Sequence, residues 1–414
     1  MRAALHLPAF PRLLGAYAVS QLGDWAAEVA LAVLIYSLTA NPLAVAITWL
    51  VHRCLFGLAA PLLVARLERH RPQRLLPALA VTQAVIFATL ALSARTVGLP
   101  GILVLVAADA LIAPVSRAFI RSTIASITRP AGLLAEGNAA VNVAFTTNAM
   151  LAAAVGGVLT ATLGPPAALA FNALTFLAVA ALLSSAALPH NAATTDADPA
   201  GEPSAIAALK AAVAYIRDQR PLGLMLGACT AFTVFAMTIT PVEVVLVRDS
   251  LHASSAALGV VLGAWGVGMI AGGALVGRAQ RRVGLAALLI GAAVAEAAAF
   301  LGMGVSVSII EVAAFSAVGG LGNGLEGVLF MTAVQKRTSD AYQARVSGLM
   351  EALLTTAVGV GFIAGGTIAA LAGARATYLV AGLGSLAVIA WTVARLRAHR
   401  TASSARAVPA VATA

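Results

Sequence analysis

Charged residues are scarce in this sequence. Only 10% of its 414 residues are Asp, Glu, Lys or Arg, whereas 61% are hydrophobic, and the mean hydropathy is +0.95. A water-soluble globular protein of this length needs far more charged and polar surface than such a composition can supply. The composition therefore excludes a soluble enzyme or binding module and indicates a polytopic membrane protein.

The sequence also lacks the residue patterns of most catalytic and cofactor sites. Its two cysteines, Cys54 and Cys229, both lie within apolar runs, so we expect buried hydrophobic roles and no extracellular disulfide. The six histidines and two cysteines show no metal-ligand spacing, and no G-x-x-x-x-G-K-S/T sequence occurs. No Ser-His-Asp order can be argued without a soluble domain. We therefore expect no enzyme activity, no metal site, no cofactor and no ATP-driven pump.

Long hydrophobic runs fill most of the chain. A membrane-spanning helix needs roughly 20 apolar residues to cross about 30 Å of hydrocarbon. The sequence contains twelve such runs and predicts an all-α membrane protein. They cover approximately residues 13–38, 42–65, 75–94, 100–121, 137–163, 166–188, 221–247, 255–277, 284–303, 305–330, 346–372 and 375–395.

The basic residues predict the orientation of these spans. If the N-terminus is cytoplasmic, 21 of the 26 Lys and Arg residues lie on that side, three (Arg95, Arg248 and Arg375) lie outside and two (Arg53 and Arg117) lie within spans. This positive-inside bias predicts that both termini are cytoplasmic. We expect the protein to lie in the inner, cytoplasmic membrane. The net charge of +10 then reports orientation and implies no nucleic-acid partner. The first ten residues carry no cleavable signal, so an uncleaved first span is expected.

The longest polar stretch divides the chain into six spans plus six. We expect an N-terminal bundle over 1–188, a cytoplasmic connector with an amphipathic helix over 189–220, a C-terminal bundle over 221–397 and a cytoplasmic tail over 398–414.

The two halves share an internal repeat. Sliding the sequence by 209 residues (373 minus 164) superposes VGGVLTATLGPPAALAFNALTFLAV on AGGTIAALAGARATYLVAGLGSLAV. Three glycines of the first half then meet three of the second: Gly156, Gly157 and Gly164 fall on Gly365, Gly366 and Gly373. Parallel six-helix repeats, with a site near the midplane between the halves, are a transporter architecture.

Several segments resemble the major facilitator superfamily. The loop GGALVGRAQRR is similar to that family's signature, roughly G-x-L-a-D-R-x-G-R-R, and LLVARLERHRPQRLL is a more divergent first-half copy. The segments RAFIRSTIASITRPAGLLAEGNAAVN and QKRTSDAYQARVSGLMEAL resemble the macrolide-efflux and enterobactin-exporter-like branch. The resemblance covers essentially the whole chain. It implies twelve transmembrane helices in two pseudo-symmetric six-helix bundles, and a monomer.

The resemblance also implies a conformational latch in the two signature loops. Glu68 stands where the family usually has Asp, and Arg69 and Arg278 match its Arg. In the family, charge pairs in these loops hold the halves together in one of two states, so we expect these three residues to bias the conformation. The alternative is that they are plain positive-inside charge.

Two acids lie in the first predicted span. Asp24 is eleven residues past Leu13, so it lies about 16 Å deep, and Glu28 follows one turn later on the same face. Gln21 extends this polar face, which the family's architecture turns toward the central cavity. A carboxylate at this depth costs several kcal/mol, so we expect Asp24 and Glu28 to couple protons. The alternative is a structural ion pair with Arg53 of the second span.

The second and fourth spans carry further ionisable residues. Asp109 lies near the midplane, and Arg117 is two turns closer to the cytoplasm. We expect Asp109 to take part in proton coupling and Arg117 and Arg53 to line the substrate cavity, with pairing to charges on the first or second span as the alternative. For His52, a neutral, packed side chain is expected.

The second half offers fewer candidates. Asn323 and Glu326 lie in the Gly-rich run GGLGNGLEGVLF, whose glycines helix packing alone can explain. We expect Glu326 to couple protons, and Asn323 and Glu243 to line the substrate cavity. Glu296 falls in a peripheral span and has no evident role.

These features together predict a secondary active transporter in the lipid bilayer. We expect it to export a small amphipathic molecule, such as a drug, siderophore or other natural product, by alternating access and proton antiport. An importer or uniporter stays open, because the Gly-Pro of a common antiporter motif is replaced by Ala152 and Ala153. A receptor or assembly factor that transports nothing is the other alternative, but it needs no ionisable residues at the midplane.

Overall fold

The computed structural model describes residues 2–55, 63, 67, 71–186, 205–339 and 342–407. Within these ranges the chain is helical and contains no strand. The N-terminal half holds α1 (Arg2–Leu5), α2 (Phe10–Thr39), α3 (Pro42–Leu50), η1 (Val51–Leu55), α5 (Pro72–Thr128), α6 (Leu134–Leu163) and α7 (Pro165–Ser184). The C-terminal half follows α8 (Ala205–Asp218) and holds α9 (Arg220–Ala236), η2 (Thr240–Val242), α10 (Glu243–Val245), η3 (Leu246–Ser250), α11 (Ser255–Gln280), α12 (Leu285–Val305), α13 (Ile309–Arg337) and α14 (Gln343–Ala407).

The helices confirm the predicted all-α membrane fold. Among the described residues, nine helical stretches are long and apolar enough to cross a membrane. Two helices contain sharp breaks, at Gly98 in α5 and at Gly373 in α14, so each holds two predicted spans. Gly98 has φ 62° and ψ −171°, a conformation open only to glycine. Helix α6 and helix α3, which begins the second predicted span, are not among the nine stretches. When they are included, the helices agree approximately with the twelve expected spans.

Local sequence signals explain where individual helices begin. The side chain of Asn41 accepts a hydrogen bond from the backbone N–H of Leu43 at 2.9 Å, and Pro42 occupies the first turn of α3. At the start of α13 the Ser308 hydroxyl accepts from the N–H of Glu311, whose carboxylate in turn accepts from the N–H of Val307. This arrangement resembles a capping box, with the carboxylate bonded to the residue before the N-cap.

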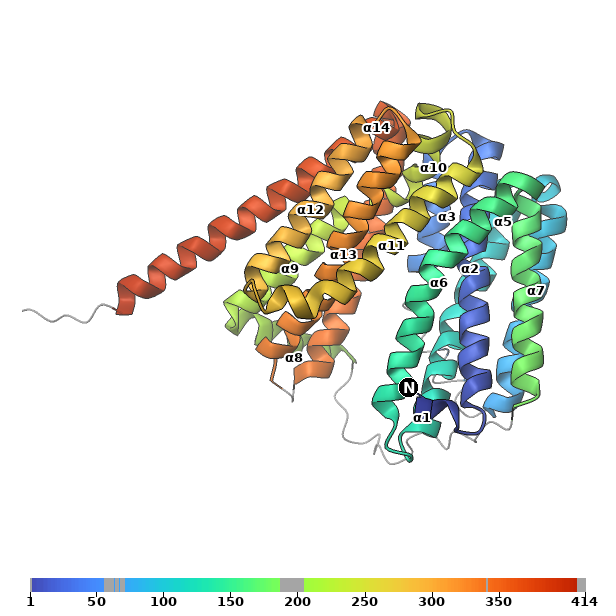
Figure 1. Cartoon of the computed structure of the whole chain (residues 1–414), viewed down its shortest axis with the longest axis horizontal. Helices are drawn as coiled ribbons and strands as arrows, with labels where there is room; N and C mark the ends of the chain where they lie inside the picture. The colour runs from blue at the N-terminus through green and yellow to red at the C-terminus, as the bar shows by residue number, and fades with distance from the viewer. Residues whose placement is uncertain are drawn as a thin grey trace, which may run out of the picture.

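The two halves lie side by side and are tilted relative to each other. Figure 1 shows α2, α3, α5, α6 and α7 grouped together, and α9 to α14 grouped beside them. The groups approach each other at the end that holds α10 and diverge toward the end where α1 and α8 lie. The hydrophobic cores match this arrangement, because the halves share one core where they approach and have separate cores where they diverge.

One core cluster spans both halves at the first of these ends. It includes Ile35 and Val45 from the N-terminal half and Val244 and Leu258 from the C-terminal half. At the opposite end the described residues form separate cores: one contains only N-terminal residues, and two contain only C-terminal residues. Among the described residues, the halves therefore share a buried apolar core at one end only.

The internal repeat has a structural counterpart. Gly164 and Gly373, which the 209-residue offset superposes, have nearly the same backbone conformation, with φ 84° and ψ 165° against φ 85° and ψ 169°. Gly157 and Gly366 also play matching roles, because each meets the opposite half. A β-carbon on Gly157 would lie 2.6 Å from the α-carbon of Gly259, and one on Gly366 would lie 2.5 Å from the β-carbon of Ala46.

Helix α8, in the expected connector, is docked on the C-terminal half. The ring of Tyr215 stacks on Tyr342 with 4.3 Å between centroids, and the backbone N–H of Ser339 donates to the Tyr215 hydroxyl at 3.0 Å. Gln219 donates to the same hydroxyl at 2.9 Å. The rest of the connector, 187–204, lies outside the described residues.

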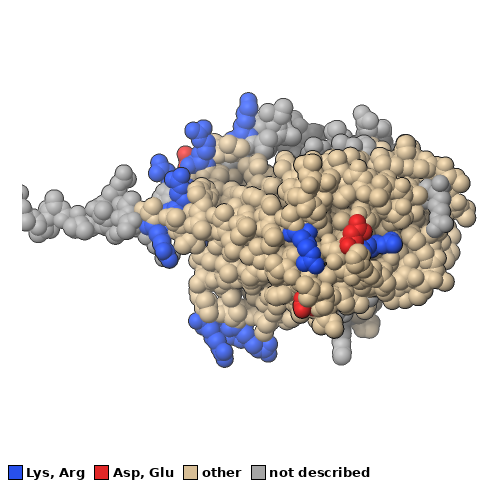
Figure 2. Space-filling model, turned by 90° about the horizontal axis from the view of Figure 1, so that it is seen from above, with Lys and Arg blue, Asp and Glu red and all other residues tan. Residues whose placement is uncertain are grey.

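The face on which the halves meet carries few charged side chains. Figure 2 views the molecule from this end: most of the surface is uncharged, and an acidic group lies between basic ones toward its middle. The sparse charge matches the sequence, which assigns only three of its Lys and Arg residues to the loops of this end.

Candidate functional site

Ionisable side chains from α2, η1 and α5 meet inside the N-terminal half. Asp24 and Glu28 lie one turn apart on α2, so they point to the same side of that helix. His52 and Arg53 lie in η1, a single π-helical turn, and both reach toward these acids although they are adjacent in sequence. Asp109 comes from α5.

Arg53 forms an ion pair with Glu28. Its Nη2 atom donates to both carboxylate oxygens of Glu28, at 2.6 and 2.7 Å, and the Glu28 side chain is 12% exposed. The guanidinium also lies 5.4 Å from the ring centroid of Trp25 and 5.2 Å from that of Trp49. Cation–π contacts lower the cost of holding this charge among apolar helices. The alternative of an Asp24–Arg53 pair, open from the sequence, is not formed.

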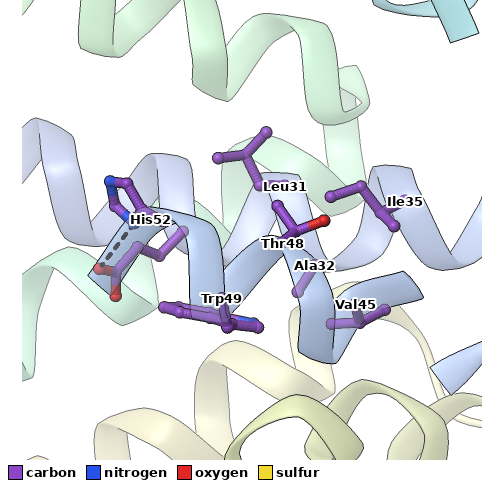
Figure 3. A pocket seen from close by; sticks show the side chains of 8 residues that line it. Leu31, Ala32, Ile35, Val45, Thr48, Trp49 and His52 are labelled. Carbon is purple, nitrogen blue, oxygen red and sulfur yellow. Dashed lines mark ion pairs between the residues drawn. The ribbon is translucent and has the colours of Figure 1, made fainter. Parts of the chain in front are cut away.

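His52 lies between two carboxylates. Its Nε2 atom is 3.3 Å from Oδ2 of Asp109, and its Nδ1 atom is 4.0 Å from Oε1 of Glu28. Figure 3 shows the His52 ring at the edge of a small apolar pocket, with the contact between His52 and Glu28 drawn as a dashed line. The pocket volume of about 10 Å³ has room for at most a single water molecule. The expectation of a neutral, merely packed His52 did not foresee these two acidic neighbours.

Asp109 is the most enclosed acid of the group, with 2% of its surface exposed. The amide of Gln83, also on α5, donates to Oδ1 of Asp109 at 2.8 Å, while His52 contacts the other oxygen. Asp109 therefore has a partner on each oxygen. The group of the second predicted span that contacts this acid is His52, which we expected from the sequence to be neutral and packed.

Asp24 is held by a neutral amide and not by an arginine. The amide of Asn172 on α7 donates to Oδ1 of Asp24 at 3.4 Å. Gly23 permits this approach, because a β-carbon there would lie 2.1 Å from the side-chain oxygens of Asn172 and Thr175. Asp24 also lines a small internal pocket with Gln21 and Arg117, two of the expected cavity residues.

The acids, the arginines and His52 form what we call the N-terminal cluster: Asp24, Glu28, Asp109, His52, Arg53 and Arg117. Asp24 lies within electrostatic range of Asp109, Arg117, His52 and Glu28. Three carboxylates face two arginines, so with a neutral His52 the full set carries one excess negative charge. A single proton, on His52 or on a carboxylate, makes the cluster neutral. Strongly interacting groups of this kind share such a proton as a unit.

The candidates of the second half lie elsewhere. Glu326 and Asn323, on α13, contact Glu296 of α12, which the sequence left without a role. Glu243 begins α10 near the buried ring of Tyr378. The structure brings neither Glu326 nor Glu243 to the N-terminal cluster.

Of the expected latch residues, Glu68 and Arg69 lie outside the described residues. Arg278 is exposed in the last turn of α11, where its charge complements the helix dipole. It forms no ion pair with any residue that the structure describes.

Sequence reasoning missed the neutral amides Gln83 and Asn172. Both lie within predicted apolar spans, and a lone amide in such a span usually has a hydrogen-bond partner inside the protein. It also missed the hydrogen bond from Tyr36 to Asp249, which joins the two halves.

Comparisons with known proteins decide the family. Residues 2–412 match the family model described as "Transmembrane secretion effector", a branch of the major facilitator superfamily. The chain belongs to this family. It is therefore a multi-pass membrane transporter and not an enzyme. No curated protein sequence matches the chain at a significant level.

Solved transporter structures share the fold of this family member. A mutant of the nucleoside transporter NupG aligns with a TM-score of 0.76 and 13% identity over 93% of this chain and 99% of its own. A bacterial homologue of the iron transporter ferroportin, in an inward-facing state, aligns with a TM-score of 0.69 and 14% identity over 93% and 98%. The human organic anion transporter MFSD10 aligns with a TM-score of 0.58 and 17% identity over 93% and 100%. At these identities the likeness concerns the fold alone.

Proposed function

We propose that this transporter exports a small amphipathic molecule in exchange for protons, in line with the resemblance of its sequence to the macrolide-efflux and enterobactin-exporter-like branch. The N-terminal cluster is the observation that carries the proposal. It links α2, η1 and α5 through ion pairs and hydrogen bonds, and it is one proton away from neutrality. Burying such a group is costly, so its presence in the membrane favours a functional role.

The cluster can exchange a proton for a substrate. When it is neutral, the proton compensates its charge. A cationic group of the substrate near Asp24 would compensate the same charge and displace the proton, so substrate and proton bind alternately. Asp24 is the favoured exchange site, because the group that donates a hydrogen bond to it is the neutral amide of Asn172, whereas Glu28 is held by Arg53.

We propose that this conformation of the transporter is inward-facing. The shared core and the Tyr36–Asp249 hydrogen bond close one end of the molecule, and the positive-inside bias assigns that end to the outside. At the other end the cores are separate, and Arg278 is exposed. In the outward-facing state Arg278 would meet the first-half loop that holds Glu68 and Arg69.

Transport measurements in proteoliposomes test the coupling. A panel of amphipathic compounds is assayed with and without an imposed pH gradient, first for the unmodified protein. We expect Asp24→Asn to abolish gradient-driven transport while downhill exchange of the same compound continues. Wild-type rates with unchanged pH dependence in Asp24→Asn would overturn this assignment. Movement of the compound in the same direction as the protons would favour the importer alternative.

Labelling of introduced cysteines tests the orientation. A cysteine at position 200 should react with an impermeant reagent only from the cytoplasmic side, and one at position 375 only from outside. The opposite pattern would contradict both the orientation and the inward-facing assignment.

A further inference from the structure

A cavity lies inside the C-terminal half, away from the N-terminal cluster. Its volume is about 360 Å³, and α9, α12, α13 and the second half of α14 form its walls. The lining is mostly apolar and includes Met225, Phe232, Leu289 and Phe330, together with the thiol of Cys229. Cavities of this size in proteins bind small organic molecules.

Two carboxyl groups lie at the inner end of this cavity. Glu326 of α13 lines the cavity, and Glu296 of α12 is in hydrogen-bonding contact with it. Glu296 is only 2% exposed. The Oε2 atom of each residue is buried and has no hydrogen-bond partner among the described residues.

The packing of α12 on α13 forces these carboxyl groups together. Gly322 lies one turn before Glu326, and a β-carbon there would be 2.6 Å from the backbone oxygen of Ala292 and 3.1 Å from the backbone nitrogen of Glu296. The two helices therefore touch backbone to backbone at this level. This contact fixes the positions from which the two acidic side chains extend.

Such a pair favours a bound cation. Two carboxyl groups in contact hold at most one negative charge between them, because repulsion opposes the second ionisation, and a cation beside them favours that ionised form over the neutral pair. Their two unpartnered oxygens remain as acceptors. A cation with several N–H donors would compensate that charge and satisfy the oxygens, whereas an anion would be repelled and a neutral molecule would gain no charge-assisted hydrogen bond.

The far end of the cavity is basic. Arg337, at the last position of α13, lies on its lining eleven residues beyond Glu326, which corresponds to about 16 Å along the helix. Pro221 and Leu285, at the starts of α9 and α12, line this same end. The cavity is therefore elongated, with acid at one end and apolar walls along its length.

We propose that this cavity is a second binding site, which takes an elongated amphipathic amine with its ammonium group on the Glu296–Glu326 pair and its hydrocarbon body along α9 and α13. The site is built entirely within the C-terminal half. It does not depend on proton exchange in the N-terminal cluster.

The thiol of Cys229 reports on occupancy of the cavity. In a Cys54→Ala background, reconstituted in lipid nanodiscs, the rate of Cys229 modification by N-ethylmaleimide is measured with decylamine, decanol or decanoate present. These probes share one chain and differ in head group. We expect decylamine to protect the thiol at concentrations about tenfold below those of decanol, because a charge-assisted hydrogen bond adds that much affinity, and decanoate to protect least. If the thiol is unreactive, the rise in melting temperature that each of the three probes causes provides the same comparison.

Charge-removing variants supply the controls. Glu296→Gln combined with Glu326→Gln keeps the shape of the cavity and should make decylamine and decanol equally protective. Arg337→Gln removes a charge at the other end and should leave the preference for the amine intact. Equal protection by decylamine and decanol in the protein that keeps Glu296 and Glu326 would overturn the proposal. The cavity would then be a site for hydrocarbon or lipid chains. An amine preference that survives in the double variant would also overturn it. Neither result bears on the proton-driven transport of the Asp24→Asn experiment.

Discussion

The hydroxyl of Tyr36 donates a hydrogen bond to the carboxylate of Asp249, and this contact joins α2 of the N-terminal half to η3 of the C-terminal half. It lies at the end where the halves share a core, which includes Ile35 and Val247 close to these two residues in the chain. A hydrogen bond across a breakable interface stabilises the closed arrangement of that end relative to the open one.

Tyr36→Phe should therefore favour opening of this end. Loss of one hydrogen bond corresponds to about fivefold in the conformational equilibrium. The measurement is the labelling rate of a cysteine introduced at Val45, which is fully buried in the shared core. Thr39→Val is the matched control, since the Thr39 hydroxyl donates to the carbonyl of Ile35 in its own helix. Equal labelling rates in the two variants would contradict a gating role for Tyr36.

Gly366→Ala should disfavour the same closed arrangement by steric means. The added β-carbon would lie 2.5 Å from the β-carbon of Ala46 and 3.1 Å from the α-carbon of Leu43, both in the opposite half. We expect faster labelling at position 45 and slower turnover. Gly227→Ala on α9 meets nothing within 4 Å and should leave both unchanged. If Gly366→Ala behaves like that control, the halves do not close through this contact.

The Glu28–Arg53 ion pair should show energetic coupling. Glu28→Gln and Arg53→Gln should each lower the free energy of unfolding by about 1–3 kcal/mol, because each leaves a charge without its partner. The free energy of unfolding should fall less in the double variant than the sum of the two single losses, by about 1–2 kcal/mol. Unfolding in detergent by denaturant measures this cycle. For Asp24→Asn combined with Arg53→Gln, the losses of unfolding free energy should be more nearly additive. A coupling energy between Asp24 and Arg53 larger than that between Glu28 and Arg53 would instead support an Asp24–Arg53 ion pair.

Docking of α8 should depend on pH through Tyr215. The hydrogen bond from Ser339 lowers the pKa of the Tyr215 hydroxyl below its ordinary value of 10.0, and the bond from Gln219 adds to this. Since the pKa is lower when α8 is docked, docking is favoured increasingly as the pH rises through the docked pKa toward the undocked one. Below both values this contribution is absent. Ultraviolet titration of tyrosinate, compared between wild type and Tyr215→Phe, should assign the earliest ionising tyrosine to Tyr215. A titration at or above pH 10 would contradict the docking geometry.

The amino-acid sequence alone was enough to establish the fold class and the repeat. Twelve apolar runs with few charges can only be stable as helices in a bilayer, since every backbone polar group must bond within its own segment. The repeat could be read down to single positions: Gly164 and Gly373 turn the chain in the same way, because only glycine adopts their backbone conformation at low cost. Asp24, Glu28 and Asp109 were also identifiable, because a carboxylate within an apolar run is costly to bury in the membrane.

The partners of these residues within the membrane followed only from the packing of the helices. From the sequence Arg53 could pair with Asp24 or Glu28, which lie one turn apart on one face, and the rotation of η1 against α2 selects Glu28. Asn172 reaches Asp24 across 148 positions of sequence because Gly23 lets α7 approach α2. The sequence left Glu296 isolated on a peripheral span, whereas the packing of α12 against α13 at Gly322 brings it to Glu326. Hydropathy and spacing record how deep a residue lies and on which face. Which neighbour it meets depends on how helices far apart in the chain rotate and pack against one another.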